Sequence, residues 1–282
     1  MLFRSFRSEL VGSFSTGSND NPTVEIIEAA FRHHKMNFRY INCEVLPEDL
    51  KAAVDGARAM GWMGFNCSIP HKVEVIKHLD GLGESAAVIG AVNCAVLRNG
   101  KFIGENTDGK GFLASLQTVI DPKDKEVVIF GAGGAARAVA VEVALAGACC
   151  ITIVNRDEKR GKELANLLND KTKTTAEFVQ WSLTYQIPSS AHVVVNATSM
   201  GMHPNVTQKL DFNVDTLLSH MVVADVVVNP PETVLIKDAT EKGCKVLNGF
   251  GMIVNQGVLS VKYWTGKDVS PDVMRERLLE LL

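Results

Sequence analysis

A glycine-rich turn between a strand-like run and a helix-like run restricts the fold of this chain more than any other feature. The run Glu126–Phe130 has the length and apolar character of a short buried strand. It is followed by Gly131-Ala132-Gly133-Gly134-Ala135-Ala136 and then by an Ala- and Val-rich stretch that ends at Gly147. A G-x-G-x-x-G/A pattern between a strand and a helix is typical of the first turn of a dinucleotide-binding unit.

Each small residue of this turn has a physical role. Gly131 permits the tight turn, Gly133 lets the backbone approach a pyrophosphate, and Ala136 lets the helix pack closely on the strand. The amides at the start of the helix supply free N–H groups and a partial positive charge for the phosphates. The alternative is a purely structural turn. The predicted cofactor contacts in this turn are Gly131, Gly133, Gly134 and Ala135.

The next strand-like run, Ile151–Val154, is followed by charged residues at the place where the adenosine ribose is bound. Asp157 can accept hydrogen bonds from both ribose hydroxyls, which favours NAD and repels a 2′-phosphate. Arg156 and Arg160 can instead bind that phosphate, which favours NADP. We lean to NAD, because a carboxylate here is hard to reconcile with a nearby phosphate, and NADP stays open. The predicted contacts in this stretch are Asn155, Arg156, Asp157 and Arg160.

The rest of the chain alternates strand-like and helix-like segments, which is typical of an α/β protein with largely parallel strands. In the first part we expect helices at 22–34, 47–60 and 73–79, and strands at 38–44, 64–68 and 91–98, the last before an Asn99-Gly100 turn. After Pro122 we expect strands at 126–130, 151–154, 193–195 and 222–228, and helices at 159–168 and over most of 252–282.

Composition excludes several classes of protein. The 282 residues carry a net charge of −3 without a basic stripe, which argues against nucleic acid as a partner. No apolar run reaches membrane-spanning length, so no membrane partner is expected. The six cysteines form no C-x-x-C pair and no disulfide-like framework, which predicts a reduced, cytoplasmic protein without a metal site.

Three short polar stretches lie before the glycine turn, where buried strands are expected to end. Oxidation of a secondary alcohol needs a base for the hydroxyl proton while hydride leaves. A lysine that is partly desolvated in a cleft can have its pKa lowered toward the working range, and a carboxylate beside it can orient both lysine and substrate. Lys72 and Asp108 are therefore the predicted acid–base pair, since there is no Tyr-x-x-x-Lys pair. His71 is expected to point elsewhere. The three stretches are 66–72, 90–94 and 104–109.

With these motifs identified, the sequence resembles the shikimate dehydrogenase family, including its quinate/shikimate branch. The stretches at 66–72, 90–94 and 104–109 are similar to N-V-T-x-P-x-K, G-A-V-N-T and G-x-N-T-D-G. The stretches at 196–202 and 248–256 are similar to N-A-T-S-x-G-M and D-G-x-x-M-L-V-x-Q. Six such motifs, counting the glycine turn, occur in family order over most of the chain.

The resemblance implies an α/β fold of two domains with the active site in the cleft between them. Residues 1–108 would form an open α/β substrate-binding domain, completed by C-terminal helices at 252–282, and residues 109–251 a Rossmann-type dinucleotide-binding domain. The implied activity is the reversible, NAD(P)-dependent oxidation of a ring hydroxyl of shikimate, quinate or a related cyclic polyol acid. That activity belongs to aromatic amino acid biosynthesis, the chorismate pathway. A homodimer remains open.

The resemblance also implies roles for single residues. Lys72 matches the catalytic lysine, and Asp108 matches its aspartate partner. Asn93 and Gln256 match residues that hydrogen-bond ring hydroxyls, and Ser68 stands where the family has a substrate-contacting threonine. Further cofactor contacts are implied at Thr198, Val226, Gly249 and Met252.

The sequence departs from the family in two places that concern the substrate. The family's first loop, G-x-P-I-x-H-S-x-S-P, supplies two serines that hold the substrate carboxylate. Here the stretch Gly12–Pro22 is one residue longer, and Asn19 and Asn21 take the serine positions. Val228 replaces the family's tyrosine, which removes a hydroxyl from the pocket. These changes indicate that the acid–base chemistry is retained, whereas the groups that bind the substrate differ from those of the family.

Two alternatives follow from those departures. One is a divergent dehydrogenase that acts on another polyol or on an amino-sugar acid. The other is a non-catalytic, nucleotide-binding regulator. Retention of Lys72 together with Asp108 argues against the regulator, since a binding module has no need of an acid–base pair.

Overall fold

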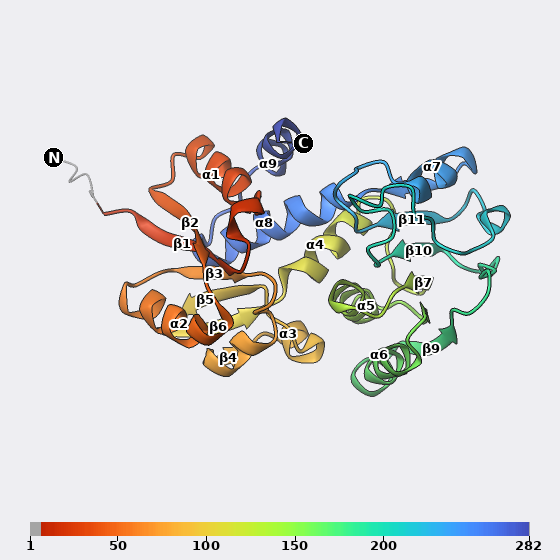
Figure 1. Ribbon diagram of the computed structural model, residues 1–282, viewed down its shortest axis with the longest axis horizontal. Helices are drawn as coiled ribbons and strands as arrows, with labels where there is room; N and C mark the ends of the chain where they lie inside the picture. Colours follow the sequence, from red (N-terminus) through yellow and green to blue (C-terminus); the bar gives the residue numbers. More distant parts are fainter. Residues whose placement is uncertain (1–6, 282) are drawn as a thin grey trace. The chain divides into compact units, whose positions relative to one another are not determined.

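The computed structural model describes residues 7–281 as two compact units, each built around a six-stranded sheet (Figure 1). Unit 1 holds the described residues up to Thr107 together with those from Gln256 onward, and unit 2 holds Asp108–Asn255. The chain enters unit 2 within helix α4 (Thr107–Leu116) and returns within helix α8 (Gly249–Thr265). The predicted α/β fold class is confirmed.

The sheet of unit 1 is mixed, with strand order β2-β1-β3-β5-β6-β4. Strand β1 runs parallel to β2 and β3, and β4 runs parallel to β6, whereas β5 is antiparallel to both of its neighbours. The reversal follows from Asn99-Gly100, whose positive φ angles of 52° and 77° form the tight turn of a hairpin. The expectation of largely parallel strands is therefore wrong at β5. The strands are β1 (Glu9–Ser15), β2 (Phe38–Glu44), β3 (Gly64–Cys67), β4 (Gly81–Leu82), β5 (Cys94–Arg98) and β6 (Lys101–Glu105).

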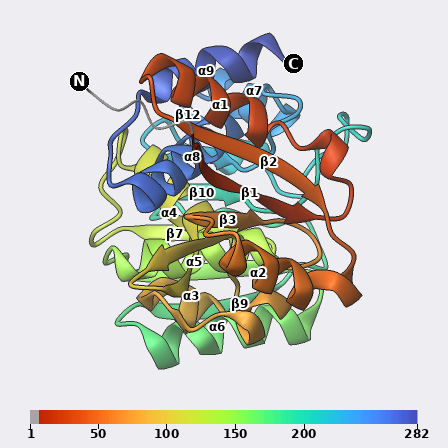
Figure 2. The same ribbon diagram turned by 90° about the vertical axis from the view of Figure 1, so that its left-hand side faces the viewer.

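Helices cover this sheet, and aromatic side chains fill the space beneath them. The ring centroids of Phe14 and Phe65 are 4.6 Å apart, and those of Phe65 and Phe102 are 5.2 Å apart. Helices α1 and α9 lie side by side in both views (Figure 1, Figure 2). The helices are α1 (Thr23–His33), α2 (Leu50–Ala59), α3 (Glu84–Ile89) and α9 (Pro271–Glu280), with short 3-10 turns at Ser18–Asp20, Pro47–Asp49 and Glu74–His78.

The strand β1 was missed by the sequence analysis for a physical reason. Ser13 and Ser15 are buried together with Val11 and Phe14, so the strand shows no alternation of apolar and polar residues. Alternation is expected only where one face of a strand meets water. By contrast, the strand expected at 38–44 coincides with β2, whose side chains are in part exposed.

The sheet of unit 2 is parallel throughout, with order β12-β11-β10-β7-β8-β9. The order reverses between β7 and β10, which is the switch point of a doubly wound nucleotide-binding sheet. The strands are β7 (Glu126–Phe130), β8 (Cys150–Asn155), β9 (Thr175–Gln180), β10 (Val193–Asn196), β11 (Val222–Asp225) and β12 (Lys245–Leu247). The helices are α5 (Gly134–Leu145), α6 (Glu158–Lys171) and α7 (Val234–Glu241), with a 3-10 turn at Val214–Thr216.

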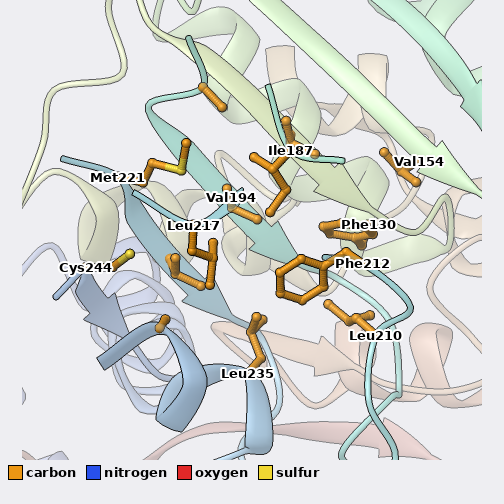
Figure 3. Close-up of a cluster of buried hydrophobic side chains, with 14 of the residues drawn as sticks. Phe130, Val154, Ile187, Val194, Leu210, Phe212, Leu217, Met221, Leu235 and Cys244 are labelled. Carbon is orange, nitrogen blue, oxygen red and sulfur yellow. The ribbon is translucent and has the colours of Figure 1, made fainter. Parts of the chain in front are cut away.

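One apolar cluster packs against this sheet (Figure 3). Phe130 and Val194 come from the central strands, and the rings of Phe130 and Phe212 lie 5.8 Å apart. Strands covered on both faces explain the continuous valine runs in the sequence. Within residues 7–281, no helix combines the length and apolar character needed to cross a membrane.

Candidate active site

The glycine turn lies at the carboxyl edge of the parallel sheet of unit 2. Gly131 follows β7 with a φ of +111°, a conformation that L side chains rarely adopt. A Cβ on Gly131 would also lie 2.9 Å from the carbonyl oxygen of Ala197 and 3.1 Å from Cγ2 of Thr198. The turn and the segment after β10 are therefore in close contact, which brings the two predicted cofactor residues Gly131 and Thr198 together.

The start of helix α5 opens onto a cavity of about 340 Å³. No protein atom lies within 4 Å of a Cβ placed on Gly133 or on Gly134, so a ligand can approach the backbone there. Two guanidinium groups and the first amides of a helix face the same space, which suits the anionic phosphates of a dinucleotide. The cavity is lined by Ala132, Gly133, Gly134, Arg137, Arg160, Glu163 and Leu164.

Arg137 was not among the predicted cofactor residues. It lies in the first turn of α5, where burial lowers its pKa and the charge of Glu163 opposes that shift. Its position, as the one cation in a helix sequence of mostly small and apolar residues, is a signal that could have been used. Ala135, which was predicted, lies in the same turn and is half-buried.

The predicted ribose contacts lie where β8 meets α6. The Asp157 carboxylate accepts a hydrogen bond of 3.0 Å from the backbone N–H of Arg160 and so caps α6. The guanidinium of Arg160 lies 3.7 Å from the same carboxylate, and both groups are exposed. The Asn155 side chain donates to the backbone oxygen of Asp157 at 2.8 Å, and Gln180 donates to that of Arg156, also at 2.8 Å. Asp157 favours NAD in the sequence analysis and Arg160 favours NADP. In the structure these two side chains form one exposed ion pair.

The buried carboxylate of Asp225 holds the residues that follow strands β10 and β11, at the carboxyl edge of the unit 2 sheet. Asp225, at the end of β11, accepts hydrogen bonds from the side chains of Asn196 (3.0 Å) and Thr233 (2.7 Å) and from the N–H of Val227 (2.9 Å). Burial raises the pKa of Asp225, whereas these bonds act to lower it. The amide oxygen of Asn196 in turn accepts from the backbone and hydroxyl of Thr198. The network therefore sets the position of Thr198.

The remaining predicted cofactor contacts of unit 2 are Val226, Gly249 and Met252. A Cβ on Gly249 would overlap the backbone carbonyls of Val226 and Val227, so glycine is needed there. Val226 follows β11 directly, and Met252 is half-buried in the first turn of α8. Asn196 and Asp225 were missed as positioning residues, although both are polar groups at the ends of buried strands.

In unit 1, the backbone joins three predicted substrate and catalytic residues in one corner. The carbonyl oxygen of Lys72 accepts from the N–H of Val92 at 2.7 Å, and the carbonyl oxygen of Asn93 accepts from Cys67 at 2.9 Å, next to Ser68. Lys72 and Ser68 are half-buried. His71 is buried, and its Nε2 lies 2.8 Å from the carbonyl oxygen of Val45, which gives this histidine a structural partner.

Asn93 holds the residue that precedes Asp108. Its side-chain oxygen accepts from the N–H of Thr107 at 2.6 Å, and its amide donates to the Thr107 hydroxyl at 2.9 Å. Behind it, Asn66 donates to the Asn93 carbonyl oxygen at 3.0 Å and accepts from the Tyr40 hydroxyl at 2.9 Å. The residue predicted to bind ring hydroxyls therefore also anchors the first turn of α4. Asp108 itself is half-buried and belongs to unit 2.

The predicted substrate loop, Gly12–Pro22, carries Asn19 and Asn21 where the family has two serine hydroxyls. The side-chain oxygen of Asn21 accepts from the N–H of Thr23 at 3.0 Å and so fixes the start of α1. Asn19 is exposed in the 3-10 turn. Gln256, the last predicted substrate contact, lies in the unit 1 part of α8 and is 7% exposed.

Comparison with known proteins identifies the family. Three family models match the chain: a shikimate dehydrogenase substrate binding domain at residues 22–95, a shikimate/quinate 5-dehydrogenase at 114–230, and a shikimate 5'-dehydrogenase C-terminal domain at 249–279. The shikimate dehydrogenase (NADP(+)) of Methanocaldococcus jannaschii is 41% identical over 254 residues, or 89% of each chain. The chain belongs to the shikimate dehydrogenase family.

Two solved structures are similar to the chain over nearly its whole length. A 5-ketofructose reductase of Gluconobacter sp., in ligand-free form, is 53% identical with a TM-score of 0.96 and covers 99% of this chain and 100% of its own. The quinate dehydrogenase of Corynebacterium glutamicum, in complex with NAD, is 31% identical with a TM-score of 0.88 and covers 97% and 99%.

This shikimate dehydrogenase family member is an NAD(P)-dependent oxidoreductase of the shikimate/quinate type that acts on a small molecule. The lean to NAD remains a prediction, because relatives at this distance are named for NADP(+) while the quinate dehydrogenase holds NAD. The open helix start, the cavity and the two guanidiniums of unit 2 fit either dinucleotide.

Proposed function

We propose that this enzyme reversibly oxidises one ring hydroxyl of shikimate, quinate or a related cyclic polyol, with Lys72 and Asp108 as the acid–base pair. Unit 1 would bind the substrate and unit 2 the dinucleotide. The observation that carries the proposal is the anchoring of both residues: the Lys72 backbone is bound to Val92, and the residue before Asp108 is bound to Asn93. Groups that exchange protons with a substrate have to be held in place.

The proposed roles follow from the donor and acceptor atoms available. When bound, the nicotinamide supplies the acceptor for the hydride. Lys72 takes the hydroxyl proton at Nζ during oxidation and returns a proton to the carbonyl oxygen during reduction, while Asp108 orients the ammonium group and the substrate. The remaining substrate contacts are proposed at Asn19, Asn21, Ser68, Asn93 and Gln256.

For the cofactor we propose a preference for NAD. The Asp157 carboxylate is exposed at the end of β8 and is held there by the N–H of Arg160, so it can accept bonds from a ribose. The neighbouring Arg160 guanidinium partly balances that charge. The proposed contacts are Gly131, Gly133, Gly134, Ala135, Asn155, Arg156, Asp157, Arg160, Thr198, Val226, Gly249 and Met252.

A second candidate function is the reduction of a neutral polyhydroxylated ketone. It is favoured by the 53% identity to the 5-ketofructose reductase, which is higher than the 41% identity to the shikimate dehydrogenase of M. jannaschii. The same residues would serve, with Lys72 protonating the carbonyl oxygen as hydride arrives at the carbon. We also propose a cytoplasmic location, since all six cysteines are unpaired thiols.

The test is turnover of shikimate, quinate and 5-ketofructose with both cofactors, followed by nicotinamide absorbance, in the natural enzyme and in Lys72→Ala. We expect kcat to fall by about 10²- to 10⁴-fold in the variant, with cofactor affinity nearly unchanged, because only proton transfer loses its group. Lys77→Ala is the matched control, since Lys77 is exposed and pairs with Glu74 at 2.8 Å. Equal losses of turnover and cofactor binding in Lys72→Ala would show a structural role instead.

A further inference from the structure

The face of α8 that carries Gln256 is packed against the sheet of unit 1. Gln256, Ser260 and Trp264 are spaced by four residues, so they lie on one face of the helix. Trp264 is buried, and its Nε1–H donates to the carbonyl oxygen of Ala95 in β5 at 3.0 Å. The ring centroids of Trp264 and of Tyr40 in β2 are 6.0 Å apart. This part of α8 is therefore held by two strands.

Ser260, one turn after Gln256, contacts the residue that precedes Asp108. Ser260 is 0% exposed, and its hydroxyl oxygen lies 3.3 Å from the hydroxyl oxygen of Thr107. The same oxygen accepts a hydrogen bond of 3.2 Å from the side-chain amide of Asn66, a residue 194 positions earlier in the chain. One hydroxyl of α8 thus joins β3 to the first residue of α4.

The orientation of the Asn66 side chain follows from the groups around it. Its amide nitrogen lies 3.0 Å from the carbonyl oxygen of Asn93, which can only accept a hydrogen bond. The amide oxygen therefore faces the Tyr40 hydroxyl at 2.9 Å, and Tyr40 has to donate. Burial raises the pKa of Tyr40, so the hydroxyl keeps its proton. Asn66 and Tyr40 are both buried, which leaves little water to replace these bonds.

These hydrogen bonds form one chain with a single direction. Tyr40 donates to Asn66, and Asn66 in turn donates to Ser260. The Ser260 proton is then available for the Thr107 hydroxyl. Thr107 also accepts from the side-chain amide of Asn93 at 2.9 Å, and its N–H donates to the same side chain at 2.6 Å. In a buried chain of this kind each bond strengthens the next, and the loss of one member leaves a buried polar group unpaired.

We infer that Ser260 and Tyr40 are positioning residues of the proposed reaction. Ser260 holds Thr107, which Asp108 follows, and lies on the face of α8 that carries Gln256. Tyr40 orients the amide that donates to Ser260. A displacement of about 1 Å in a reacting group can lower a rate by about 10²-fold, so the hold on these groups matters for turnover. The inference rests on the proposed function, since it takes Asp108 and Gln256 to act on the substrate.

The test is a single turnover of reduced dinucleotide, bound to an equal amount of enzyme, with whichever ketone the natural enzyme reduces: 5-ketofructose or the ketone formed from shikimate or quinate. The rate constant of the nicotinamide absorbance reports the chemical step, and the amplitude reports the amount of active enzyme. We expect Ser260→Ala and Tyr40→Phe each to lower the rate constant by about tenfold at unchanged amplitude, because each removes one oxygen of the chain. The double variant should also lose about tenfold, since both changes break the same chain.

Ser85→Ala is the matched control. Ser85 is a buried residue of unit 1, and among residues 7–281 its hydroxyl oxygen has no hydrogen-bond partner. We expect this variant to keep the rate constant and the amplitude of the natural enzyme.

Four results would overturn the inference: an unchanged rate constant in Ser260→Ala or Tyr40→Phe, a loss of amplitude alone, an equal fall of the rate constant in Ser85→Ala, or a loss of about a hundredfold in the double variant. If Ser260→Ala does not fold, Tyr40→Phe decides, because it removes a single oxygen at the other end of the chain.

Failure of the proposed function gives a different result. In that case the natural enzyme reduces none of these ketones with either dinucleotide, and hydrogen exchange at the N–H of Thr107 decides instead. We expect Ser260→Ala and Tyr40→Phe to speed this exchange by about tenfold or more, and Ser85→Ala to leave it unchanged, because the Thr107 amide donates to the anchoring side chain of Asn93. Faster exchange supports the positioning roles, whereas unchanged exchange overturns them.

Discussion

Asp157 has two physical roles, and they can be separated by substitution. Its carboxylate caps α6 through the N–H of Arg160, and its charge is proposed to select NAD. Asparagine is as good a cap as aspartate but is neutral. We expect Asp157→Asn to lower the ratio of kcat/KM for NAD over NADP by about tenfold, with a change in unfolding free energy well under about 1 kcal/mol.

The control for that prediction is Asp157→Ala, which removes both roles. We expect the same loss of cofactor discrimination together with a loss of about 1 kcal/mol of stability. The measurements are initial rates with each dinucleotide and a chemical denaturation curve for each variant. A cofactor ratio that stays constant in both variants would remove Asp157 from the ribose site.

Among single residues, the sequence identified the candidate site residues better than the residues that hold them in position. Lys72, Asp108 and the glycines stand in motifs, so their residue type and spacing carry the signal. Asn196 and Asp225 were missed because their importance lies in partners that are distant in the chain. The Asp225 carboxylate accepts from Asn196, which lies 29 residues away in the chain.

The glycine turn between β7 and α5 shows how one element combines a folding requirement with a binding requirement. Gly131→Ala would put a Cβ against Ala197 at a φ of +111°, so we expect a loss of stability of about 1–3 kcal/mol. Gly133→Ala meets no protein atom within 4 Å, so we expect the fold to be kept. The added methyl group would instead obstruct the approach of a pyrophosphate to the backbone.

Thermal melting and dinucleotide titration distinguish the two variants. Gly133→Ala should weaken cofactor binding by about tenfold or more without lowering the melting temperature, since only the contact with the pyrophosphate is lost. Unaltered cofactor affinity in a folded Gly133→Ala protein would mean that the pyrophosphate does not lie on this turn.

At the scale of the whole molecule, unit 1 is made of two segments far apart in the chain. Met274 and Leu278 of α9 are 0% exposed, and Arg277 pairs with Glu25 of α1 at 2.5 Å. Removing residues 271–282 would therefore expose apolar surface on both sides of this contact. Burial of two such side chains contributes about 1.5–3 kcal/mol each. That is a large part of the roughly 5–15 kcal/mol by which domains are stable.

We expect the shortened chain to show two calorimetric transitions, with unit 1 melting first and unit 2 keeping its own transition and its affinity for the dinucleotide. Unit 2 is continuous in sequence and loses none of its residues. Added dinucleotide should raise only the later transition, since a ligand stabilises the part that binds it. One transition at the natural temperature would show that α9 adds little to unit 1.

The sequence by itself determined the α/β class, the glycine turn, the family motifs and the residues of the proposed chemistry, because these depend on local periodicity and on residue type at fixed spacing. Only the tertiary structure decided that β5 runs antiparallel, that Asn93 anchors the start of α4, and that Asn196 donates to the buried carboxylate of Asp225. Those features depend on which distant segments meet. A hydrogen bond between residues tens of positions apart leaves no periodic signal in the chain that forms it.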